Sequence, residues 1–377
     1  MSKNFIMKWA RTFMFLVPAL ALAMPTLAQD RPLTLSDSQE PGSVIVFPKF
    51  VKGTVAVDGV STPITEIEVG VQCPKGATCP EHMPVKLRFH WVCPAIEGVN
   101  SQICRENNFD VTTTVNGKVV FGPDAIPIPG SAAVTPGTPP AALCPMGYLV
   151  GWVINTSDQP IKFDGLIGDA VIRESSTSVG AYDAIPIQAA TGLATGALIT
   201  TSTDPLTGIP SLVFDGADAH YLTVPGTVRG DVKFDKVTGT APLSQTFLTL
   251  LTLDVRSDQP NFPTGVDLDF YTAGETLLSE SLEFVCWTQV SLSSIDPNLN
   301  QTFMGRKGSF FTGPAFKFPI NGIFDTAGPV TLLGLVETLE GPTTDTLSSR
   351  TYFTGVFNNS VPVPTIFVPE FTRGTGP

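Results

Sequence analysis

Hydrophobic and polar residues alternate along most of the chain. Short runs of alternating or β-branched residues recur from residue 42 onward, bounded by Gly, Pro, Asn or Asp. Period-two alternation predicts β-strands, because successive side chains of a strand point to opposite faces. Clear examples are GSVIVFPKFV (42–51), PVKLRFHWVC (84–93), GYLVGWVIN (147–155), GVDLDFYT (265–272) and PVTLLGLVET (329–338). The pattern predicts an all-β fold.

Turn signals refine this prediction. Asn116-Gly117 separates two strand-like runs, which favours a two-residue type I′ hairpin because both turn positions need positive φ. The 34 prolines suit loops and strand edges better than helices. Only residues 181–199, rich in small side chains, suggest a helix. Many short strands predict two β-sandwich domains of immunoglobulin-like or jelly-roll-like type.

The first 28 residues have the organisation of a cleaved signal peptide. Three basic residues, Lys3, Lys8 and Arg11, precede an apolar run over residues 13–24, and small residues precede Gln29. The run is shorter than the roughly 20 apolar residues of a membrane-spanning helix. We therefore expect export, cleavage before Gln29, and a mature chain without a transmembrane anchor.

The length and a change in composition predict two domains. About 350 mature residues exceed what one hydrophobic core usually serves. Aromatic and charged residues become scarce near 190–210. We place a linker at 29–41, the first domain at 42–200 and the second at 205–377. Residues 122–142, rich in Pro and Gly, are expected to form a long surface loop in the first domain.

The chain is acidic but sparsely charged. It contains 22 basic and 34 acidic residues, a net charge of −12. Loss of the three basic residues of the signal segment leaves 19 against 34, or −15. Such a chain repels nucleic-acid phosphates, so we expect no nucleic-acid partner. Charged residues make up 15 % of the chain, against about 25 % in typical domains.

Cysteine usage fits an oxidising compartment. Six cysteines allow 15 pairings, and the candidates are Cys73, Cys79, Cys93, Cys104, Cys144 and Cys286. Local spacing favours the pairs 73–79 and 93–104. Residues 144 and 286 would then either join the two domains or remain buried thiols. A zinc site is disfavoured, because the first pair lacks the C-x₂-C spacing.

Two oxygen-rich segments are candidates for metal binding. FDGADAHY brings Asp215, Asp218 and His220 within six residues, which could hold a divalent cation. The same residues also suit a β-turn with Asp and Gly at its corners. SIDPNLN offers Asp296, Asn298 and Asn300 to Ca²⁺, but it lacks the length and the terminal glutamate of an EF-hand loop.

Asp169 lies in the segment IKFDGLIGDAVIRES. If this segment is a strand, Asp169 shares a face with Arg173, and Asp164 points to the other face. One strand then cannot supply the paired carboxylates of a glycosidase. We interpret Asp169 as a structural acid, held by Arg173 or by the backbone. The sequence contains no G-x-S-x-G, H-E-x-x-H or P-loop motif, so no catalytic residue is assigned.

The order of several motifs carries a resemblance. GSVIVFPKF is followed by GYLVGWVIN, PIKFDGLIGDAVIRES and SVGAYDAIPIQA. This order resembles a loosely defined family of uncharacterised exported bacterial proteins, whose members begin with a GSVLI(F/Y) strand. They also carry a YLIGD segment corresponding to Gly165–Asp169. The resemblance covers mainly residues 42–190, and FVCWTQVSL in the second half is a further similar segment. It implies a secreted, β-rich, two-part architecture and brings no activity or cofactor.

Three classes of function remain open. The favoured one is a non-catalytic secreted or cell-surface protein, structural or adhesive, which acts through its faces and self-associates or binds a surface partner. The second is a glycan- or ligand-binding module, with Trp152, Tyr182, Tyr271 and Trp287 as stacking candidates. The third is a secreted hydrolase with carboxylates from separate loops. An aromatic row on an open sheet face would favour glycan binding, converging carboxylates would favour hydrolysis, and an unpaired edge strand or a donated segment 361–371 would favour assembly.

Overall fold

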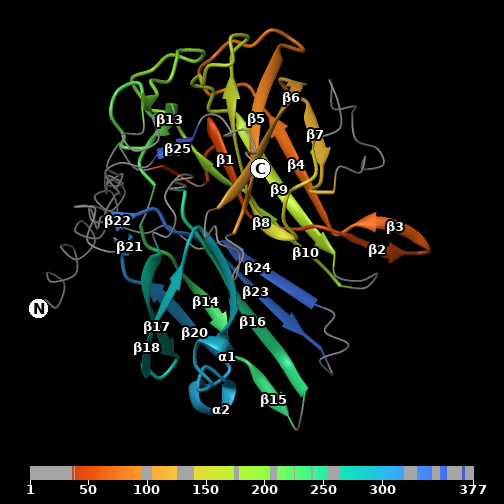
Figure 1. Cartoon of the computed structure of the whole chain (residues 1–377), viewed down its shortest axis with the longest axis vertical. Coiled ribbons are helices and arrows are strands. Elements are labelled where there is room, and N and C mark those ends of the chain that lie inside the picture. The colour runs from red at the N-terminus through yellow and green to blue at the C-terminus, as the bar shows by residue number, and fades with distance from the viewer. Residues whose placement is uncertain are drawn as a thin grey trace, which may run out of the picture. The chain divides into compact units, whose positions relative to one another are not determined.

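The computed structural model describes residues 36–37, 39–94, 104–124, 140–173, 178–203, 210–224, 226–238, 241–253, 263–317, 329–341, 349–354 and 367–369 (Figure 1). All of these residues belong to one compact unit, 34–377. Side chains are described for these residues except 237–238, 241–243, 317, 329, 349–354 and 367–369. The protein is all-β, as the alternating pattern predicts. The described residues contain two single-turn helices, α1 (Leu292–Ile295) and α2 (Gln301–Met304), and no helix long and apolar enough to cross a membrane.

Residues 44–187 form two antiparallel sheets. The five-stranded sheet has the order β11-β1-β8-β5-β6, with β1 (Val44–Val51), β5 (Pro84–Cys93), β6 (Arg105–Thr114), β8 (Met146–Ile154) and β11 (Ile185–Ile187). The four-stranded sheet has the order β10-β9-β4-β7, with β4 (Thr65–Val71), β7 (Lys118–Phe121), β9 (Leu166–Arg173) and β10 (Val179–Asp183).

Residues 229–354 form two further antiparallel sheets. The first has the order β14-β20-β17-β21-β22, with β18 paired to β17. Its strands are β14 (Arg229–Lys233), β17 (Thr264–Thr272), β18 (Leu277–Phe284), β20 (Lys307–Thr312), β21 (Ala315–Lys317) and β22 (Pro329–Val330). The second has the order β15-β16-β23-β24, with β19 paired to β16. Its strands are β15 (Lys236–Thr238), β16 (Ala241–Leu251), β19 (Trp287–Ser291), β23 (Leu333–Glu340) and β24 (Ser349–Thr354).

Two small sheets complete the described strands. One has the order β12-β13-β25, formed by β12 (Ser202–Thr203), β13 (Pro210–Val213) and β25 (Phe367–Pro369). The other pairs β2 (Thr54–Val57) with β3 (Val60–Pro63).

Three hydrophobic clusters form the core. The first contains side chains of both sheets of residues 44–187, such as Phe47 and Ile67. Another contains side chains of both sheets of residues 229–354, such as Phe270 and Leu248. The remaining cluster joins the two parts of the chain, because it includes Trp152 together with residues of β16 and β23. The core is therefore continuous across the predicted domain boundary.

A buried ion pair also crosses between the two parts. Lys49 Nζ of β1 donates to Glu337 Oε2 of β23, and the two side chains are 4 % and 1 % exposed. Gln289 Nε2 donates a second hydrogen bond to the same carboxylate oxygen over 3.1 Å. Nearby, Trp287 Nε1 donates to the carbonyl oxygen of Pro48 over 2.8 Å. Buried charges need partners of this kind, because desolvation of an unpaired ion is costly.

All six cysteines form disulfides, and two of the bonds correct the spacing argument. Cys73–Cys79 is present as predicted. Cys93 instead bonds Cys144, and Cys104 bonds Cys286, with sequence separations of 51 and 182 residues. Spacing was misleading because β5 and β6 are paired neighbours and place Cys93 opposite Arg105, which leaves the two sulfur atoms on different sides. The link between the two parts of the chain therefore runs from Cys104 to Cys286.

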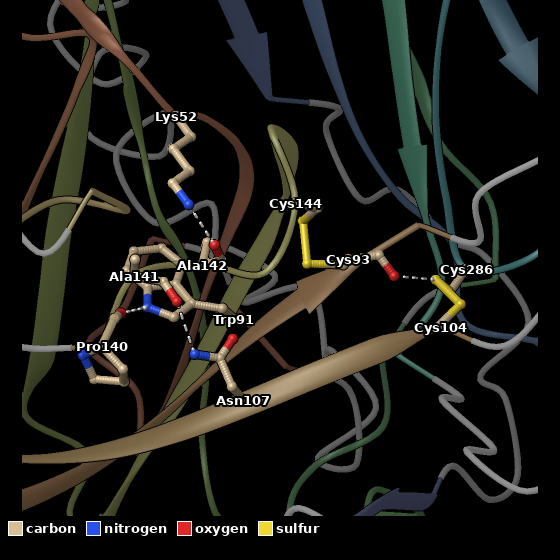
Figure 2. Close-up of a disulfide and its surroundings, with 10 residues drawn as sticks. All are labelled: Lys52, Trp91, Cys93, Cys104, Asn107, Pro140, Ala141, Ala142, Cys144 and Cys286. Carbon is tan, nitrogen blue, oxygen red and sulfur yellow. Dashed lines mark hydrogen bonds between the residues drawn. A yellow bond between two sulfur atoms is a disulfide. The ribbon is translucent and has the colours of Figure 1, made fainter. Parts of the chain in front are cut away.

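Figure 2 shows these two disulfides next to each other. The Cys286 sulfur lies 3.7 Å from the carbonyl oxygen of Cys93. The three residues at 140–142, just before Cys144, are held by their carbonyl oxygens, which accept hydrogen bonds from Trp91, Asn107 and Lys52 over 2.9–3.1 Å. The end of the Pro- and Gly-rich segment is thus fixed to the five-stranded sheet by both covalent and polar contacts.

Two local predictions were wrong. The Asn116-Gly117 turn exists, and Asn116 has φ +61°, but β6 and β7 belong to different sheets and form no hairpin. Val115 is buried in the first core cluster, so the turn leads the chain from one sheet to the other. Residues 181–199 contain no helix and include the end of β10 and all of β11. The signal segment 1–28 and most of the loop 122–142 lie outside the described residues, and the division at 42–200 and 205–377 stays a prediction.

Candidate functional site

Four carboxylates line an open pocket on the outer face of the four-stranded sheet. Glu68 of β4 lies opposite Asp169 of β9, and Asp169 lies opposite Asp183 of β10. Glu40, from the segment before β1, completes the set, and the pocket has a volume of about 430 Å³. We call this site, defined by these four residues, the acidic pocket. Directly opposed residues of paired strands have Cβ atoms about 4.5–5.5 Å apart, so the three strand carboxylates form a close row.

The alternation of the strands places these carboxylates outside. In β4, Thr65, Ile67 and Val69 are buried and the residues between them, including Glu68, are half-buried. In β9, Leu166 and Ala170 are buried, so Asp169 points outward. Gly168, which lies between them in β9, faces inward, because an added Cβ there would lie 2.6 Å from the Glu68 carbonyl oxygen and 2.9 Å from the buried ring of Phe47.

The charges of the acidic pocket are unevenly compensated. Lys118 Nζ donates to Glu68 Oε2 over 2.8 Å. Asp169 makes no side-chain hydrogen bond or ion pair with any residue that the structure describes. Burial raises the pKa of Asp169 above its ordinary value, and the negative charges of Glu68 and Asp183 raise it further. A carboxyl whose pKa is raised by burial and by nearby carboxylates has one property of a general acid.

The structural role predicted for Asp169 belongs to Asp164. Asp164 Oδ1 accepts hydrogen bonds from Ser43 Oγ at 2.6 Å and from the backbone N–H of Ala189 at 2.9 Å. Arg173, the predicted partner of Asp169, forms an ion pair with Glu66 at 3.1 Å. The face that Asp169 and Arg173 share is the solvent-facing one, because Ile167 on it is 46 % exposed. A carboxylate on this face needs no buried partner, which removes the reason for the predicted pair.

A second exposed surface lies on the sheet that contains β17. In β17, Leu268 and Phe270 are buried, while Asp267, Asp269 and Tyr271 point outward. Leu277 of β18 lies directly opposite Tyr271, and Phe311 of β20 lies opposite Asp269. Phe316 of β21 lies opposite Gly265, farther along the same face. We call this surface, defined by Tyr271, Leu277, Phe311 and Phe316, the aromatic face.

The exposed rings of the described residues are concentrated on this face. Four aromatic side chains are classed as exposed, namely Tyr271, Phe303, Phe311 and Phe316, with exposed fractions of 37–56 %. Three of the four belong to the aromatic face, and Phe303 is in α2. Tyr271, Leu277 and Phe311 are direct or diagonal neighbours on three adjacent strands. They therefore form one contiguous patch rather than scattered apolar residues.

Of the four residues predicted to stack on a glycan, one is accessible. Trp152, Tyr182 and Trp287 are 0 %, 4 % and 7 % exposed, so their rings are not available to a ligand. Trp152 stacks on His90 at 4.7 Å, and Trp287 donates to Pro48. Tyr271 is exposed and lies on the aromatic face. Strand alternation alone could not separate these residues, because a ring suits either face of a sheet.

The FDGADAHY segment forms a turn held by its own side chains. Asp215 Oδ1 accepts from the backbone N–H of Ala217 over 2.9 Å and lies 2.8 Å from His220 Nδ1. Ala219 has φ +66°, and Asp218 is exposed. Asp215 and His220 thus meet, and Asp218 takes no part in their contact. Within the described ranges, no three Asp, Glu, His or Cys side chains are gathered as a metal ion would need.

The SIDPNLN segment uses its oxygens for turns and a helix cap. Asp296 Oδ1 accepts from the backbone N–H of Asn298 over 2.6 Å. Asn300 is the N-cap of α2, and its Oδ1 accepts from Thr302 and Phe303 over 2.8 and 3.1 Å. These bonds satisfy the free N–H groups at the start of the helix, which is a sufficient structural role for both side chains.

Comparison of the chain with protein-family models and with curated proteins finds no match. The two sites therefore have to be interpreted from their own chemistry.

Six residues of these sites were missed by the sequence reasoning. Glu40, Glu68 and Asp183 belong to the acidic pocket, and Leu277, Phe311 and Phe316 belong to the aromatic face. For Glu68 and Phe311 the local signal was present in TEIEVGV and KGSFFT, where alternation assigns them to the outer face. Their grouping depends on which strands are neighbours, and that information is not local.

Proposed function

We propose that the protein is exported and acts as a non-catalytic structural or adhesive protein that binds through its surface. The signal-like segment 1–28 supports export. The three disulfides support it as well, because such bonds persist in oxidising compartments. We further propose that the chain is built of two β-sandwich domains. This is supported by the core clusters, which combine side chains from both sheets of each pair.

The aromatic face is the observation that carries this proposal. Tyr271, Leu277 and Phe311 expose apolar surface on three adjacent strands of one open sheet. Exposed apolar area of this kind costs free energy in water. A contiguous exposed patch surrounded by polar residues usually marks an interaction site. The face therefore has the properties of a surface that a partner covers.

The edge strand β18 adds support from the backbone. Among the described strands, β18 pairs only with β17, and no residue before Phe284 in it is fully buried. A free edge of eight residues offers backbone donors and acceptors to a strand of a partner. The sequence suggested residues 361–371 as a strand that could be donated to a partner. Of these, residues 367–369 form β25, which pairs with β13 of the same chain.

Binding to cells tests the proposal directly. Purified protein beginning at Gln29 should sediment with intact cells of the source organism. The variant Tyr271→Ala/Phe311→Ala should remain in the supernatant. Phe303→Ala is a matched control, because it removes an exposed ring outside the aromatic face. Equal retention of all three proteins, or retention of none, would contradict the proposal. N-terminal sequencing of secreted material tests export independently, with Gln29 expected as the first residue.

The acidic pocket supports a second candidate function, a secreted hydrolase. Asp169 has a raised pKa beside Glu68 and Asp183, and the three carboxyls come from three strands of one pocket. Glycoside hydrolysis uses a pair of neighbouring carboxyl groups, of which the general acid has a raised pKa. We rank it second for two reasons. Glu68 forms an ion pair with Lys118, and carboxylates on the outer faces of neighbouring strands can form a row without having a catalytic role.

Substrate panels separate the two candidates. Under the hydrolase alternative, turnover of a panel of glycosides and esters should disappear in Asp169→Asn and in Glu68→Gln. Under the favoured function, the wild-type protein and both variants should be equally inactive and should bind cells equally well. Activity that survives both substitutions would exclude the acidic pocket as its source.

A further inference from the structure

We propose that the aromatic face binds a neutral polysaccharide, whose sugar rings stack on Tyr271 and Phe311. The inference rests on the proposed function, since it names the chemical class of the partner that this face would bind. It depends on three features of the face: the spacing of the rings, the polar groups between them and the sign of the charge.

The rings are spaced along the strands and are not gathered in a single pocket. Tyr271 lies opposite Ser309, two residues from the pair Asp269–Phe311, so Tyr271 and Phe311 are diagonal neighbours. Diagonal residues of paired strands are about 7–8 Å apart. Phe316 lies opposite Gly265, four residues along β17 from Asp269, which corresponds to about 13 Å. An elongated chain lying along β17 would meet successive rings, whereas a small compact ligand would meet only one.

Polar groups fill the positions between the rings. Asp269 shares the outward side of β17 with Tyr271 and lies between Phe311 and Ser279 on the neighbouring strands. Ser279 Oγ donates to Asp269 Oδ1 over 2.6 Å, so the carboxylate is held in place and its second oxygen is left to accept. A sugar ring presents an apolar C–H surface with hydroxyl donors at its rim. Rings flanked by fixed acceptors match both parts of such a ligand.

The charge of the surface disfavours polyanions, although one cation, Arg229, lies opposite Phe311. Asp267 and Asp269 point outward beside Tyr271, and the whole chain has a net charge of −12. Nucleic acids and polyuronates would be repelled by this field. Hydroxyl groups of an uncharged chain can donate to the same carboxylates without a charge penalty. A neutral polysaccharide is therefore favoured over the anionic ones.

The inference is tested with the full mature protein and defined polysaccharides. Insoluble cellulose and chitin and a soluble mixed-linkage glucan serve as neutral probes, and polygalacturonate serves as the anionic one. We expect retention by at least one neutral probe and none by polygalacturonate. Tyr271→Ala/Phe311→Ala should weaken binding about tenfold or more, on the scale of other ring-stacking contacts. Phe303→Ala should bind as the wild type does, and Ser279→Ala should weaken binding about two- to threefold.

Circular dichroism and thermal unfolding first establish that each variant is folded. No retention of the wild type by any neutral probe, or equal retention of the double variant, would overturn the inference. Light scattering adds a separate outcome. If the wild type is a dimer, the double variant a monomer and no glycan is retained, the face contacts a second copy and the inference fails. Cell binding that depends on Tyr271 and Phe311 would then still support the proposed function, so the two failures remain distinguishable.

Discussion

The acidic pocket and the aromatic face both lie on outward faces of antiparallel sheets, but they differ in which side chains lie opposite one another on neighbouring strands. In the acidic pocket, Glu68, Asp169 and Asp183 face one another across three strands. On the aromatic face, Asp269 lies between Ser279 and Phe311 and accepts a hydrogen bond from the serine. The same alternation thus produces a row of like charges in one sheet and interleaved rings and acceptors in the other.

The difference teaches that cross-strand neighbours decide what an exposed carboxylate does. Like charges directly opposite each other destabilise a sheet, whereas a hydroxyl next to a carboxylate stabilises it modestly. In the acidic pocket the pKa of Asp169 is raised by burial and, in addition, by the like charges of Glu68 and Asp183. On the aromatic face the cost is exposed apolar area instead. Each surface therefore carries an unfavourable feature that folding alone does not require.

The largest expected effect on the free energy of unfolding comes from removing the disulfide that links the two parts of the chain. Cys104→Ser/Cys286→Ser removes the bond that closes 182 residues, and the free energy of unfolding should fall by roughly 5 kcal/mol. Cys73→Ser/Cys79→Ser, which opens a separation of six residues, should cost only about 2 kcal/mol. Urea unfolding followed by tryptophan fluorescence measures both values. Equal losses in the two variants would contradict the loop-length argument.

A smaller effect distinguishes the inner side of the aromatic face from its outer side. Phe270 is buried and Tyr271, the next residue, is exposed. Phe270→Ala should lower the free energy of unfolding by about 3–5 kcal/mol, because it leaves a cavity in the core. Tyr271→Ala should change it by about 0.5 kcal/mol or less, as expected of a surface residue. Similar losses in both variants would mean that Tyr271 serves folding rather than binding.

The smallest effect concerns Asp169 and has the opposite sign. Its raised folded-state pKa means that ionisation of Asp169 costs stability as the pH rises through that pKa. Asp169→Asn should therefore raise the Tm at pH 7 by about 1–2 °C, and the gain should vanish below about pH 4, where the wild-type carboxyl is protonated. Asp269→Asn is the matched control, because no carboxylate lies opposite it in the adjacent strands. Stabilisation of equal size in both variants would refute the contribution of Glu68 and Asp183 to the cost of ionising Asp169.

Much of the fold could be predicted because its signals are local. Alternation located β1, β5, β8 and β17 and assigned Asp169 to a strand. What failed depended on neighbours that are distant in sequence. Asp164 is fixed by Ser43 and Ala189, more than 20 residues away in either direction. Asn116 looked like a hairpin turn because its sequence cannot reveal that β6 and β7 belong to different sheets.

The functional surfaces were only partly predictable for the same reason. Tyr271 was identified from its residue type, but Trp152 and Trp287 were identified by the same criterion and are buried. Phe311 joins Tyr271 only because β20 is the neighbour of β17. A ring is a binding candidate when it is both exposed and next to others, and the second property depends on strands that are distant in the sequence.

The disulfide pattern has a consequence for how the chain acquires its native state after synthesis. Cys93 and Cys104 are 11 residues apart and would encounter each other before either meets its native partner, because shorter loops close with less loss of entropy. The native partners are Cys144 and Cys286, so an early 93–104 bond would be a trap. Oxidation without thiol–disulfide exchange should therefore yield scrambled material, and efficient maturation should depend on a disulfide isomerase and on release of the chain beyond Cys286.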